Sequence, residues 1–306
     1  MHRCGSAYTA GGLRRCAPNP PYDFDFWLLR WVFFALLLSA VAGSAFAQGD
    51  AQRGKYLATA GGCVGCHTEE NASAFAGGRA LKTPFGVFYG PNITPDVQHG
   101  IGRWTEADFI RAIRLGERPD GANYFPAFPY PSFTRLTDDD ARDLWAFLRT
   151  LPPSSRANKA HELHFPFSWR SLVSVWKWLF FTPGPAPDNE PQAFKRGAYL
   201  VEALGHCGEC HTPRNFLGGT KRERLLAGGK TPDGKRIPNL TPTRLKKWDD
   251  QELKEFLQTG LTPDGDVASE VMGEVIRNST SQLTPEDLAA LVAYLRSLAP
   301  LADEPR

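Results

Sequence analysis

The sequence predicts a mostly α-helical protein built from two tandem domains of one type, joined by a linker rich in proline and aromatic residues. Three observations predict this fold. The 306 residues suit about two domains, sequence markers recur once at nearly constant spacing, and both copies contain amphipathic segments with helix start signals. We divide the chain into an N-terminal extension with a signal peptide (residues 1–47), a first unit (48–151), a linker (152–194) and a second unit (195–306).

Residues 26–47 have the features of an export signal. Arg30 is followed by a short apolar stretch and then by Ala45-Phe46-Ala47, the small-x-small pattern that signal peptidase recognises. We therefore expect export to the periplasm and a mature chain that begins at Gln48. An uncleaved membrane anchor is the alternative, although the apolar stretch is shorter than the roughly 20 residues that a spanning helix needs.

The charge of the mature chain gives no reason to expect nucleic acid as a partner. The composition is globular, with 42% hydrophobic residues, and removal of residues 1–47 leaves 31 basic and 31 acidic side chains. Charge is uneven within the second unit, with a net +8 over residues 195–247 and −8 over residues 248–306. Such a dipole could steer a charged partner toward this unit.

The same markers occur in the same order in both units. Residues 53–57 (RGKYL) recur as residues 196–200 (RGAYL), and residues 91–95 (PNITP) recur as residues 238–242 (PNLTP). Other pairs are Cys63 and Cys207, Trp104 and Trp248, Gly121 and Gly265, and Leu136 and Leu283. The CxxCH groups lie 144 residues apart and the PNxTP segments 147 residues apart. This regular spacing indicates a duplicated domain.

Each unit is expected to contain three short helices separated by irregular loops. Thr105 with Asp108, and Asp249 with Glu252, are typical of capping boxes, and Gly260 is typical of a helix end. We expect opening helices near residues 50–61 and 193–204, middle helices at 106–115 and 250–259, and closing helices after Thr137 and Thr284.

The linker contains one further helical pattern. Its apolar residues keep helical spacing, with polar residues opposite: Trp169, Leu172, Val173, Trp176, Leu179 and Phe180 against Arg170, Ser174 and Lys177. Two interpretations follow. The helix packs the two units together, or its aromatic patch docks on a partner or on the membrane surface.

The two CxxCH groups predict covalent attachment of two haem c groups. Two cysteines three residues apart can form thioethers with the haem vinyl groups, and the adjacent histidine then reaches the iron. Zinc and thiol redox sites also use CxxC, but here both copies are followed by histidine, and the mature chain has no other cysteine. The predicted attachment residues are Cys63, Cys66, Cys207 and Cys210, and the predicted iron ligands are His67 and His211. The carbonyls of Pro91 and Pro238 are candidates to accept the other histidine N–H.

The second axial ligand distinguishes the two units. Met272, the only methionine of the mature chain, lies seven residues after Gly265 and is the predicted second ligand of the second haem. Phe128 occupies the corresponding place after Gly121 and cannot bind iron. The first haem is therefore five-coordinate or takes a ligand from elsewhere, the candidates being His99, His161, His164, Tyr124, Tyr130 and Lys82. Unequal ligation predicts unequal redox potentials.

Together these motifs resemble the cytochrome c subunits of bacterial membrane-associated dehydrogenases for alcohols, aldehydes and gluconate. The resemblance covers about residues 50–300 and includes the CxxCH pair, residues 90–96 (GPNITPD), residues 125–130 (FPAFPY) and residues 206–215 (HCGECHTPRN). It implies two class I cytochrome c domains, a dehydrogenase catalytic subunit as electron donor, and quinone, an oxidase or another cytochrome as acceptor. Many members of this family have three haem domains and a methionine where Phe128 stands.

We therefore expect a periplasmic dihaem cytochrome c that relays electrons, carries out no substrate chemistry of its own, and is held at the cytoplasmic membrane through its partner. One alternative is a dihaem redox enzyme of the peroxidase or thiosulfate dehydrogenase type, acting at the first haem, which Phe128 leaves without a methionine ligand. Another is a haem-bearing sensor, although no signalling domain accompanies the two units.

Overall fold

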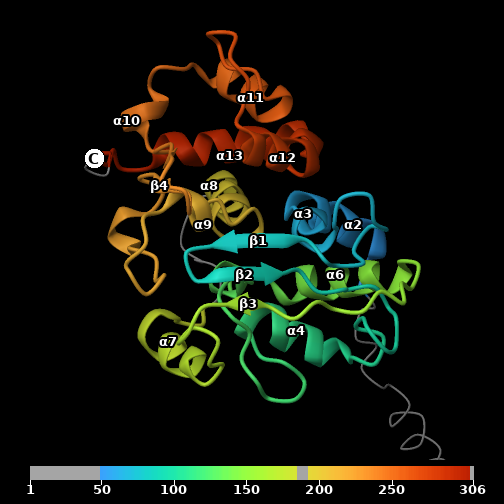
Figure 1. Ribbon diagram of the computed structural model, residues 1–306. Helices are drawn as coiled ribbons and strands as arrows, with labels where there is room; N and C mark the ends of the chain where they lie inside the picture. The colour runs from blue at the N-terminus through green and yellow to red at the C-terminus, as the bar shows by residue number, and fades with distance from the viewer. Residues whose placement is uncertain (1–48, 185–191, 304–306) are drawn as a thin grey trace, which may run out of the picture. The chain divides into compact units, whose positions relative to one another are not determined.

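The structure, a computed structural model, describes residues 49–184 and 192–303 (Figure 1). Residues 48–306 form one compact body that contains both repeat units. The expected signal peptide lies outside the described residues. No helix within the described ranges is both long and apolar enough to cross a bilayer.

The first unit follows the predicted helix order. Its helices are α2 (Ala51–Ala60), α3 (Cys63–His67), α4 (Glu106–Leu115), α5 (Tyr130–Phe133) and α6 (Asp138–Thr150). The linker contributes α7 (Leu172–Phe180). The second unit repeats the order with α8 (Gln192–Ala198), η1 (Tyr199–Leu204), α9 (Gly208–His211), η2 (Arg222–Arg224), α10 (Pro242–Leu245), α11 (Asp250–Thr259), α12 (Glu270–Asn278), η3 (Thr280–Gln282) and α13 (Pro285–Ser297). The prediction of a mostly helical protein is confirmed.

Side-chain caps start the middle and closing helices where the sequence indicates. Both capping boxes form, at Thr105 with Asp108 and at Asp249 with Glu252. Thr137 and Thr284 accept backbone N–H groups at the starts of α6 and α13. Each cap satisfies donors that the first helical turn would otherwise leave unpaired.

Short strands were not predicted, yet they tie the linker to the first unit. Strands β1 (Ala80–Thr83), β2 (Gly86–Tyr89) and β3 (Glu162–Leu163) form an antiparallel sheet in the order β1-β2-β3. In the second unit, β4 (Gly229–Lys230) pairs with β5 (Arg236–Ile237). Because β3 belongs to the linker, its pairing with β2 depends on a contact between residues far apart in the sequence.

In each unit the opening and closing helices cross at a glycine. A Cβ atom on Gly54 of α2 would lie 1.8 Å from the carbonyl oxygen of Asp143 in α6. A Cβ atom on Gly197 of α8 would lie 2.1 Å from the carbonyl oxygen of Ala290 in α13. Only glycine allows the two backbones to approach this closely. The glycine of the repeated RGxYL segment is therefore a packing residue.

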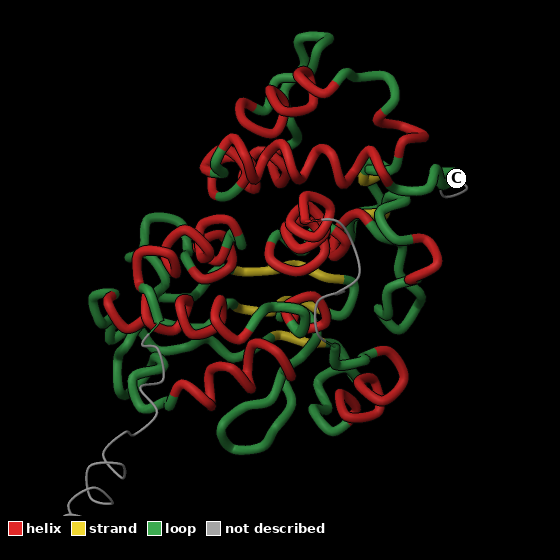
Figure 2. Tube along the Cα trace, turned by 180° about the vertical axis from the view of Figure 1, so that it is seen from behind, coloured by secondary structure: helices red, strands yellow, loops and turns green. Residues whose placement is uncertain are grey.

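One hydrophobic cluster runs through both units. It includes Leu57 and Leu148 of the first unit and Leu204 and Leu291 of the second, all buried. The two units thus share a core, and Figures 1 and 2 show their helices packed in a single body.

Helix α7 of the linker contacts both units. Lys177 donates hydrogen bonds from Nζ to the Leu115 carbonyl oxygen and to Asn123 Oδ1, both at 2.7 Å. On the second unit, Trp176 Nε1 donates to the Leu217 carbonyl oxygen at 2.9 Å. These contacts favour the interpretation in which the helix packs the units together, but they leave most of its apolar side chains exposed.

We expect the substitution Gly54→Ala to lower the free energy of unfolding by about 3 kcal/mol or more, because overpacking costs typically 1–3 kcal/mol and more where backbone must move. Denaturant unfolding of the mature protein measures this change. Gly184→Ala is the matched control, since no atom of a described residue lies within 4 Å of its added Cβ. Equal stabilities for the two variants would contradict the close helix crossing.

Candidate functional site

Each CxxCH group forms a short helical turn directly after the opening helix. In the first unit, Gly62 begins this turn with a left-handed φ of 62°, a conformation that glycine adopts without strain. Helix α3 then carries Cys63, Cys66 and His67. In the second unit, Cys207 precedes α9, which carries Cys210 and His211. Both motifs therefore have the helical geometry that the sequence predicts.

Both histidine rings are oriented by a proline carbonyl. His67 Nδ1 lies 2.8 Å from the Pro91 carbonyl oxygen, and His211 Nδ1 lies 2.7 Å from that of Pro238. A carbonyl oxygen can only accept, so Nδ1 carries the proton in both rings. The predicted role of the two proline carbonyls is confirmed.

Burial lowers the pKa of both His67 and His211, and the proline hydrogen bonds only partly oppose this effect. The imidazoles are therefore neutral near pH 7. With the proton on Nδ1, each ring has a lone pair on Nε2, which is the atom that a haem iron would bind.

The loop that presents each proline carbonyl is fixed by a buried asparagine. Asn92 Nδ2 donates to the Ser154 and Arg156 carbonyl oxygens at 2.8 and 3.0 Å. In the second unit, Asn239 Nδ2 donates to the Leu301 carbonyl oxygen at 2.8 Å and to Asp303 Oδ1 at 3.2 Å. The segment that follows each closing helix thus holds the loop in place.

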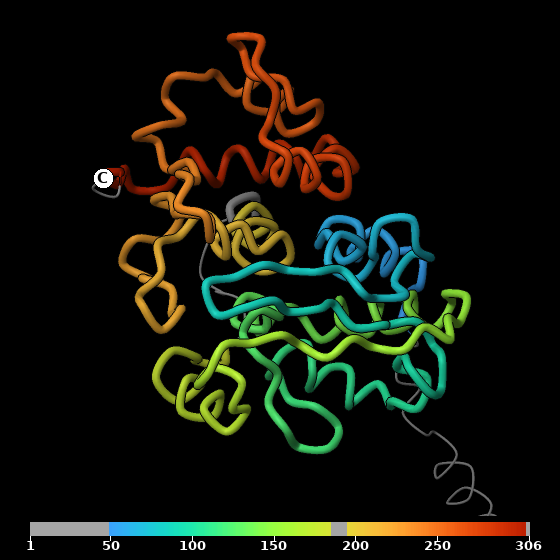
Figure 3. Tube along the Cα trace, in the orientation of Figure 1, coloured from blue at the N-terminus to red at the C-terminus, as the bar shows by residue number. Residues whose placement is uncertain are grey.

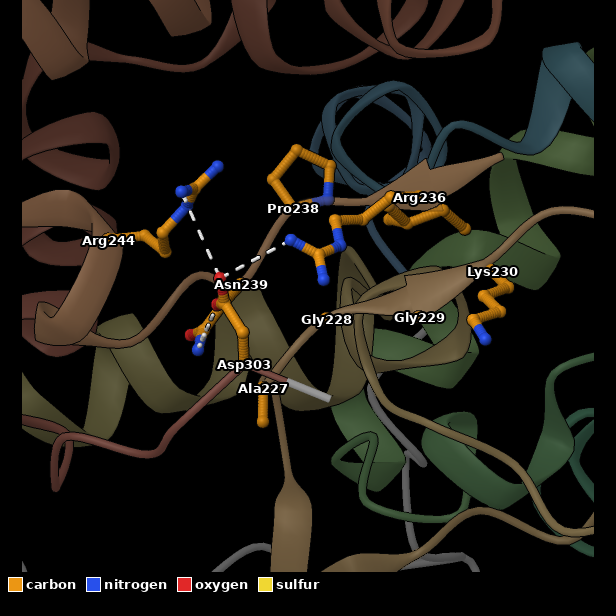
Figure 4. Close-up of a pocket in the computed structure, with 10 residues that line it drawn as sticks. Ala227, Gly228, Gly229, Lys230, Arg236, Pro238, Asn239, Arg244 and Asp303 are labelled. Atoms are coloured by element: carbon orange, nitrogen blue, oxygen red, sulfur yellow. Dashed lines mark hydrogen bonds and ion pairs between the residues drawn. The ribbon is translucent and has the colours of Figure 1, made fainter. Parts of the chain in front are cut away.

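Figure 4 shows this region of the second unit, where Asp303 also lies 3.6 Å from Arg236 and 3.9 Å from Arg244. These residues line a small pocket behind Pro238. The sequence showed that an asparagine follows the proline in both units, but it did not predict the hydrogen bonds of these asparagines. The recurrence of the PNxTP segment in both units was the feature that could have indicated their role.

The four motif thiols are unpaired and protonated. Cys63, Cys66, Cys207 and Cys210 form no disulfide. Burial raises the pKa of Cys63 to about 12 and that of Cys207 to about 12. A protonated thiol is a poor nucleophile in thiol–disulfide exchange. Two free thiols and one neutral imidazole in each motif fit the donor set of a covalently attached haem c.

Met272 and Phe128 lie in corresponding segments with different surroundings. Met272 is in the first turn of α12, and its backbone N–H is 3.4 Å from the capping Ser269 Oγ. Phe128 packs against the aromatic rings of Tyr124 and Phe133, with ring centroids 5.5 and 5.9 Å apart. The first unit thus has an aromatic cluster where the second has a thioether.

The candidate ligands of the first haem are dispersed. Tyr124 and Tyr130 contact the Phe128 ring, and the Tyr130 hydroxyl is buried with no hydrogen-bond partner among the described residues. His161 Nδ1 instead receives the Tyr89 backbone N–H at 3.1 Å. The backbone amide of His164 donates to the Phe85 carbonyl oxygen. The backbone N–H of His99 donates to Asp96 Oδ1. Lys82 belongs to β1.

Two reciprocal tyrosine–aspartate contacts join the units. Tyr56 of the first unit donates to Asp287 Oδ2 of the second at 2.6 Å, and Tyr199 of the second donates to Asp140 of the first. Each aspartate also pairs with an arginine of its own unit, Arg196 with Asp287 and Arg53 with Asp140. The interface is therefore nearly symmetric, in the manner of a two-fold dimer within one chain.

The same interface brings the two motifs close together. Helix α12 packs on α3, and Arg79 of the first unit pairs with Glu274 of α12 at 2.7 Å. Conversely, Ser132 of α5 donates to Glu209 of α9 at 2.9 Å. Partial desolvation raises the pKa of Cys66 to about 11, with further contributions from Glu274 and from Cys210 of the other motif. Sequence reasoning did not anticipate this arrangement.

A duplicated helical unit that presents a CxxCH turn beside an oriented, neutral histidine is the fold and site of a c-type cytochrome. The chain belongs to the cytochrome c family, which matches residues 51–152 and 194–299. It is a dihaem protein, and its cofactors are two haem c groups.

Relatives of known description support the same class. A diheme cytochrome c-type protein of Cereibacter sphaeroides is 48% identical over 260 residues, which cover 81% of this chain and 86% of the relative. The cytochrome c subunit of an alcohol dehydrogenase (quinone) of Gluconacetobacter polyoxogenes is 39% identical, with 89% of this chain and 62% of the relative covered. The gluconate 2-dehydrogenase cytochrome c subunit of Pantoea cypripedii is 37% identical, with 86% and 64% covered. The chain thus spans less than two thirds of both dehydrogenase subunits.

The reciprocal contacts predict a dependence of stability on pH. Burial raises the pKa of Asp287, but the hydrogen bonds from Arg196 and Tyr56 outweigh burial, and the net pKa lies below the ordinary value. The stabilisation that Asp287 provides is therefore complete above its unfolded-state pKa of about 3.9. It is lost as the pH falls through the lower pKa of the folded state.

We expect Asp287→Asn to reduce the free energy of unfolding at pH 7 and to flatten its decline under acid. Urea unfolding at a series of pH values measures both effects. Asp264→Asn, at an exposed site of the same unit, is the control. A wild-type pH profile in Asp287→Asn would show that this carboxylate does not stabilise the interface.

Proposed function

We propose that the protein is a periplasmic electron relay between a dehydrogenase and a respiratory acceptor. The residues that would hold the cofactors are Cys63, Cys66 and His67 in the first unit and Cys207, Cys210, His211 and Met272 in the second. When bound, haem c supplies a one-electron Fe(III)/Fe(II) couple. The chain fixes the orientation of both histidines and keeps the four thiols unpaired, as attachment to the haem vinyl groups requires.

The observation that carries this proposal is the placement of both CxxCH turns at one interface. The contact of α12 with α3 and the hydrogen bond from Ser132 to Glu209 keep the two motifs side by side. The shared core and the tyrosine–aspartate pairs make this arrangement rigid. A relay needs such fixed proximity, because electron transfer between two centres depends on a short and constant separation.

Unequal second ligands would give the relay a direction. A methionine thioether raises the potential by favouring Fe(II), whereas the Phe128 side chain offers no ligand. The second haem would then be the site of higher potential. Electrons would enter through the first unit and leave through the second.

The names of the relatives suggest the partners. Alcohol dehydrogenase (quinone) and gluconate 2-dehydrogenase both include a cytochrome c subunit similar to this chain. We infer that the donor is a dehydrogenase catalytic subunit and that the acceptor is quinone, an oxidase or another cytochrome. The export signal in residues 26–47 supports a periplasmic location.

The first test is the cofactor content of the mature holoprotein. We expect c-type visible bands that persist after acid extraction of free haem, together with about two irons per chain. A purified dehydrogenase of the alcohol or gluconate type should reduce both haems in the presence of its substrate. Correctly matured protein that is reduced by dithionite but by no such dehydrogenase would overturn the relay.

Phe128 also motivates a second candidate function, a redox enzyme that acts at the first haem. The packing of Phe128 among Tyr124, Tyr130 and Phe133 argues against an open substrate face on that side. Cyanide and peroxide binding to the oxidised holoprotein separates the two functions. Binding of either ligand to the first haem, with turnover, would favour the enzyme.

We expect Met272→Ala to lower the midpoint potential of the second haem by about 0.1 V or more, within the roughly 0.8 V range that axial ligands span. Potentiometric titration measures the shift, and loss of the methionine-to-iron charge-transfer band in the red identifies the ligand. The first haem serves as an internal control. An unchanged potential would mean that Met272 is not the ligand.

The converse substitution, Phe128→Met, is expected to convert the first haem to a low-spin state with a potential nearer that of the second. The reason is that a thioether would replace the phenyl ring in the segment that corresponds to Met272. Electron paramagnetic resonance of the oxidised protein reports the spin state. If Phe128→Met is indistinguishable from Phe128→Leu, residue 128 does not face the iron.

A further inference from the structure

Helix α7 of the linker packs against the protein through Val173 and Lys177, and it leaves several large apolar side chains exposed to solvent. Lys177 is only 13% exposed, because Nζ is bound by the Leu115 carbonyl, Asn123 and Glu117. Trp178, the next residue, is 82% exposed. The other large apolar side chains of this segment that are exposed are Phe165, Phe167, Trp169, Leu172, Val175 and Leu179. Amphipathic helices of water-soluble proteins normally bury most of their large apolar side chains.

The polar contacts explain why this orientation is stable. Arg170 Nη1 donates to the Asn123 carbonyl oxygen at 2.8 Å, and Asn123 Nδ2 donates to Ser174 Oγ at 3.0 Å. With Lys177, these residues anchor one side of α7 to the hairpin at residues 117–123. Rotation of the helix to bury its tryptophans would break all of these bonds. The apolar side is therefore fixed outward.

The apolar surface continues onto a neighbouring loop of the second unit. Trp176 Nε1 donates to the Leu217 carbonyl oxygen at 2.9 Å, and the Phe180 ring lies against Gly219. Phe216 in this loop is 86% exposed. Figures 1 and 2 show α7 beside this loop from opposite sides of the molecule. The outward side of α7 and Phe216 together form what we call the aromatic face.

The segment of the chain that continues from the Phe216 loop is basic. Residues 214–236, which begin in the same loop, contain seven basic and two acidic residues, a net charge of +5. Arg222, Lys230 and Lys235 are among the exposed ones. A protein interface is usually depleted in lysine at its centre, whereas an anionic lipid surface attracts lysine and arginine.

We propose that the aromatic face binds directly to the surface of an anionic phospholipid bilayer. Tryptophan side chains suit the boundary between headgroups and acyl chains, because their rings are apolar and their N–H groups are polar. With nine residues, α7 is too short to span a bilayer, so it lies along the interface. The membrane contact would then belong to this chain itself and need no partner. It depends on export of the protein but not on the electron relay.

The test is sedimentation of the full-length mature holoprotein with extruded vesicles, with bound protein measured by haem absorbance. One vesicle population is pure phosphatidylcholine, and the other contains about one third phosphatidylglycerol. We expect stronger binding to the anionic vesicles and weaker binding at high salt, since salt screens the basic residues. The double variant Trp169→Ser, Trp178→Ser is expected to lower the partition coefficient at least about tenfold.

A matched control is available in the second unit. Leu261 and Val267 are exposed apolar residues of a hairpin that Figure 3 places at the opposite end of the body from α7. The double variant Leu261→Ser, Val267→Ser should bind vesicles like the wild type. Lys230→Glu with Lys235→Glu should weaken binding to anionic vesicles only. Haem spectra and thermal unfolding of each variant show that the fold is retained, and Trp178→Phe, which keeps an aromatic ring, should retain most of the binding.

Two results would overturn the proposal. The first is an absence of binding to the anionic vesicles, or binding that the tryptophan variant and the control variant lose equally. The second is self-association, or a complex with a dehydrogenase subunit, that the tryptophan variant abolishes while vesicle binding is unchanged. The aromatic face would then be a protein interface. Neither result bears on reduction of the haems by a dehydrogenase, so failure here is distinct from failure of the relay.

Discussion

The hydrogen bond from each motif histidine to a proline carbonyl is the constraint on which both sites depend. It fixes the proton on Nδ1, the orientation of the ring and the availability of Nε2. The carbonyl is in place because Asn92 or Asn239 ties its loop to the segment that follows the closing helix. A local ligand motif therefore relies on contacts with residues more than 60 positions away along the chain.

The two units form a nearly symmetric pair, and the function that we propose depends on where the symmetry fails. Gly54 and Gly197 occupy equivalent helix crossings, and the tyrosine–aspartate contacts are reciprocal. Symmetry fails at Met272, because Phe128 occupies the corresponding position in the first unit. It also fails at α7, which covers the hairpin at residues 117–123 in the first unit only. A duplicated scaffold thus places two equivalent cofactor sites in one body, while single residues make the sites unequal.

The linker packs against both units and also presents the aromatic face to solvent. Its strand β3 completes the sheet of the first unit, and α7 contacts both units through polar groups. The Lys177 ammonium group of α7 is bonded within the protein, and Trp178 is left at the surface. Three hydrogen-bonding side chains are enough to decide this orientation, because each would lose its partner if the helix turned.

The sequence by itself determined the features that depend on short stretches of chain. These are the two CxxCH groups, the duplication, the capped middle and closing helices, and the proline carbonyls that accept from the histidines. Spacing and residue type are sufficient there, since each feature is local or repeated. Only the tertiary structure decided the pairing of Tyr56 with Asp287, the packing of α12 on α3, the addition of β3 to the sheet and the outward side of α7. A helical period shows that a helix has two sides, but the contacts that select the buried side come from residues distant in the sequence.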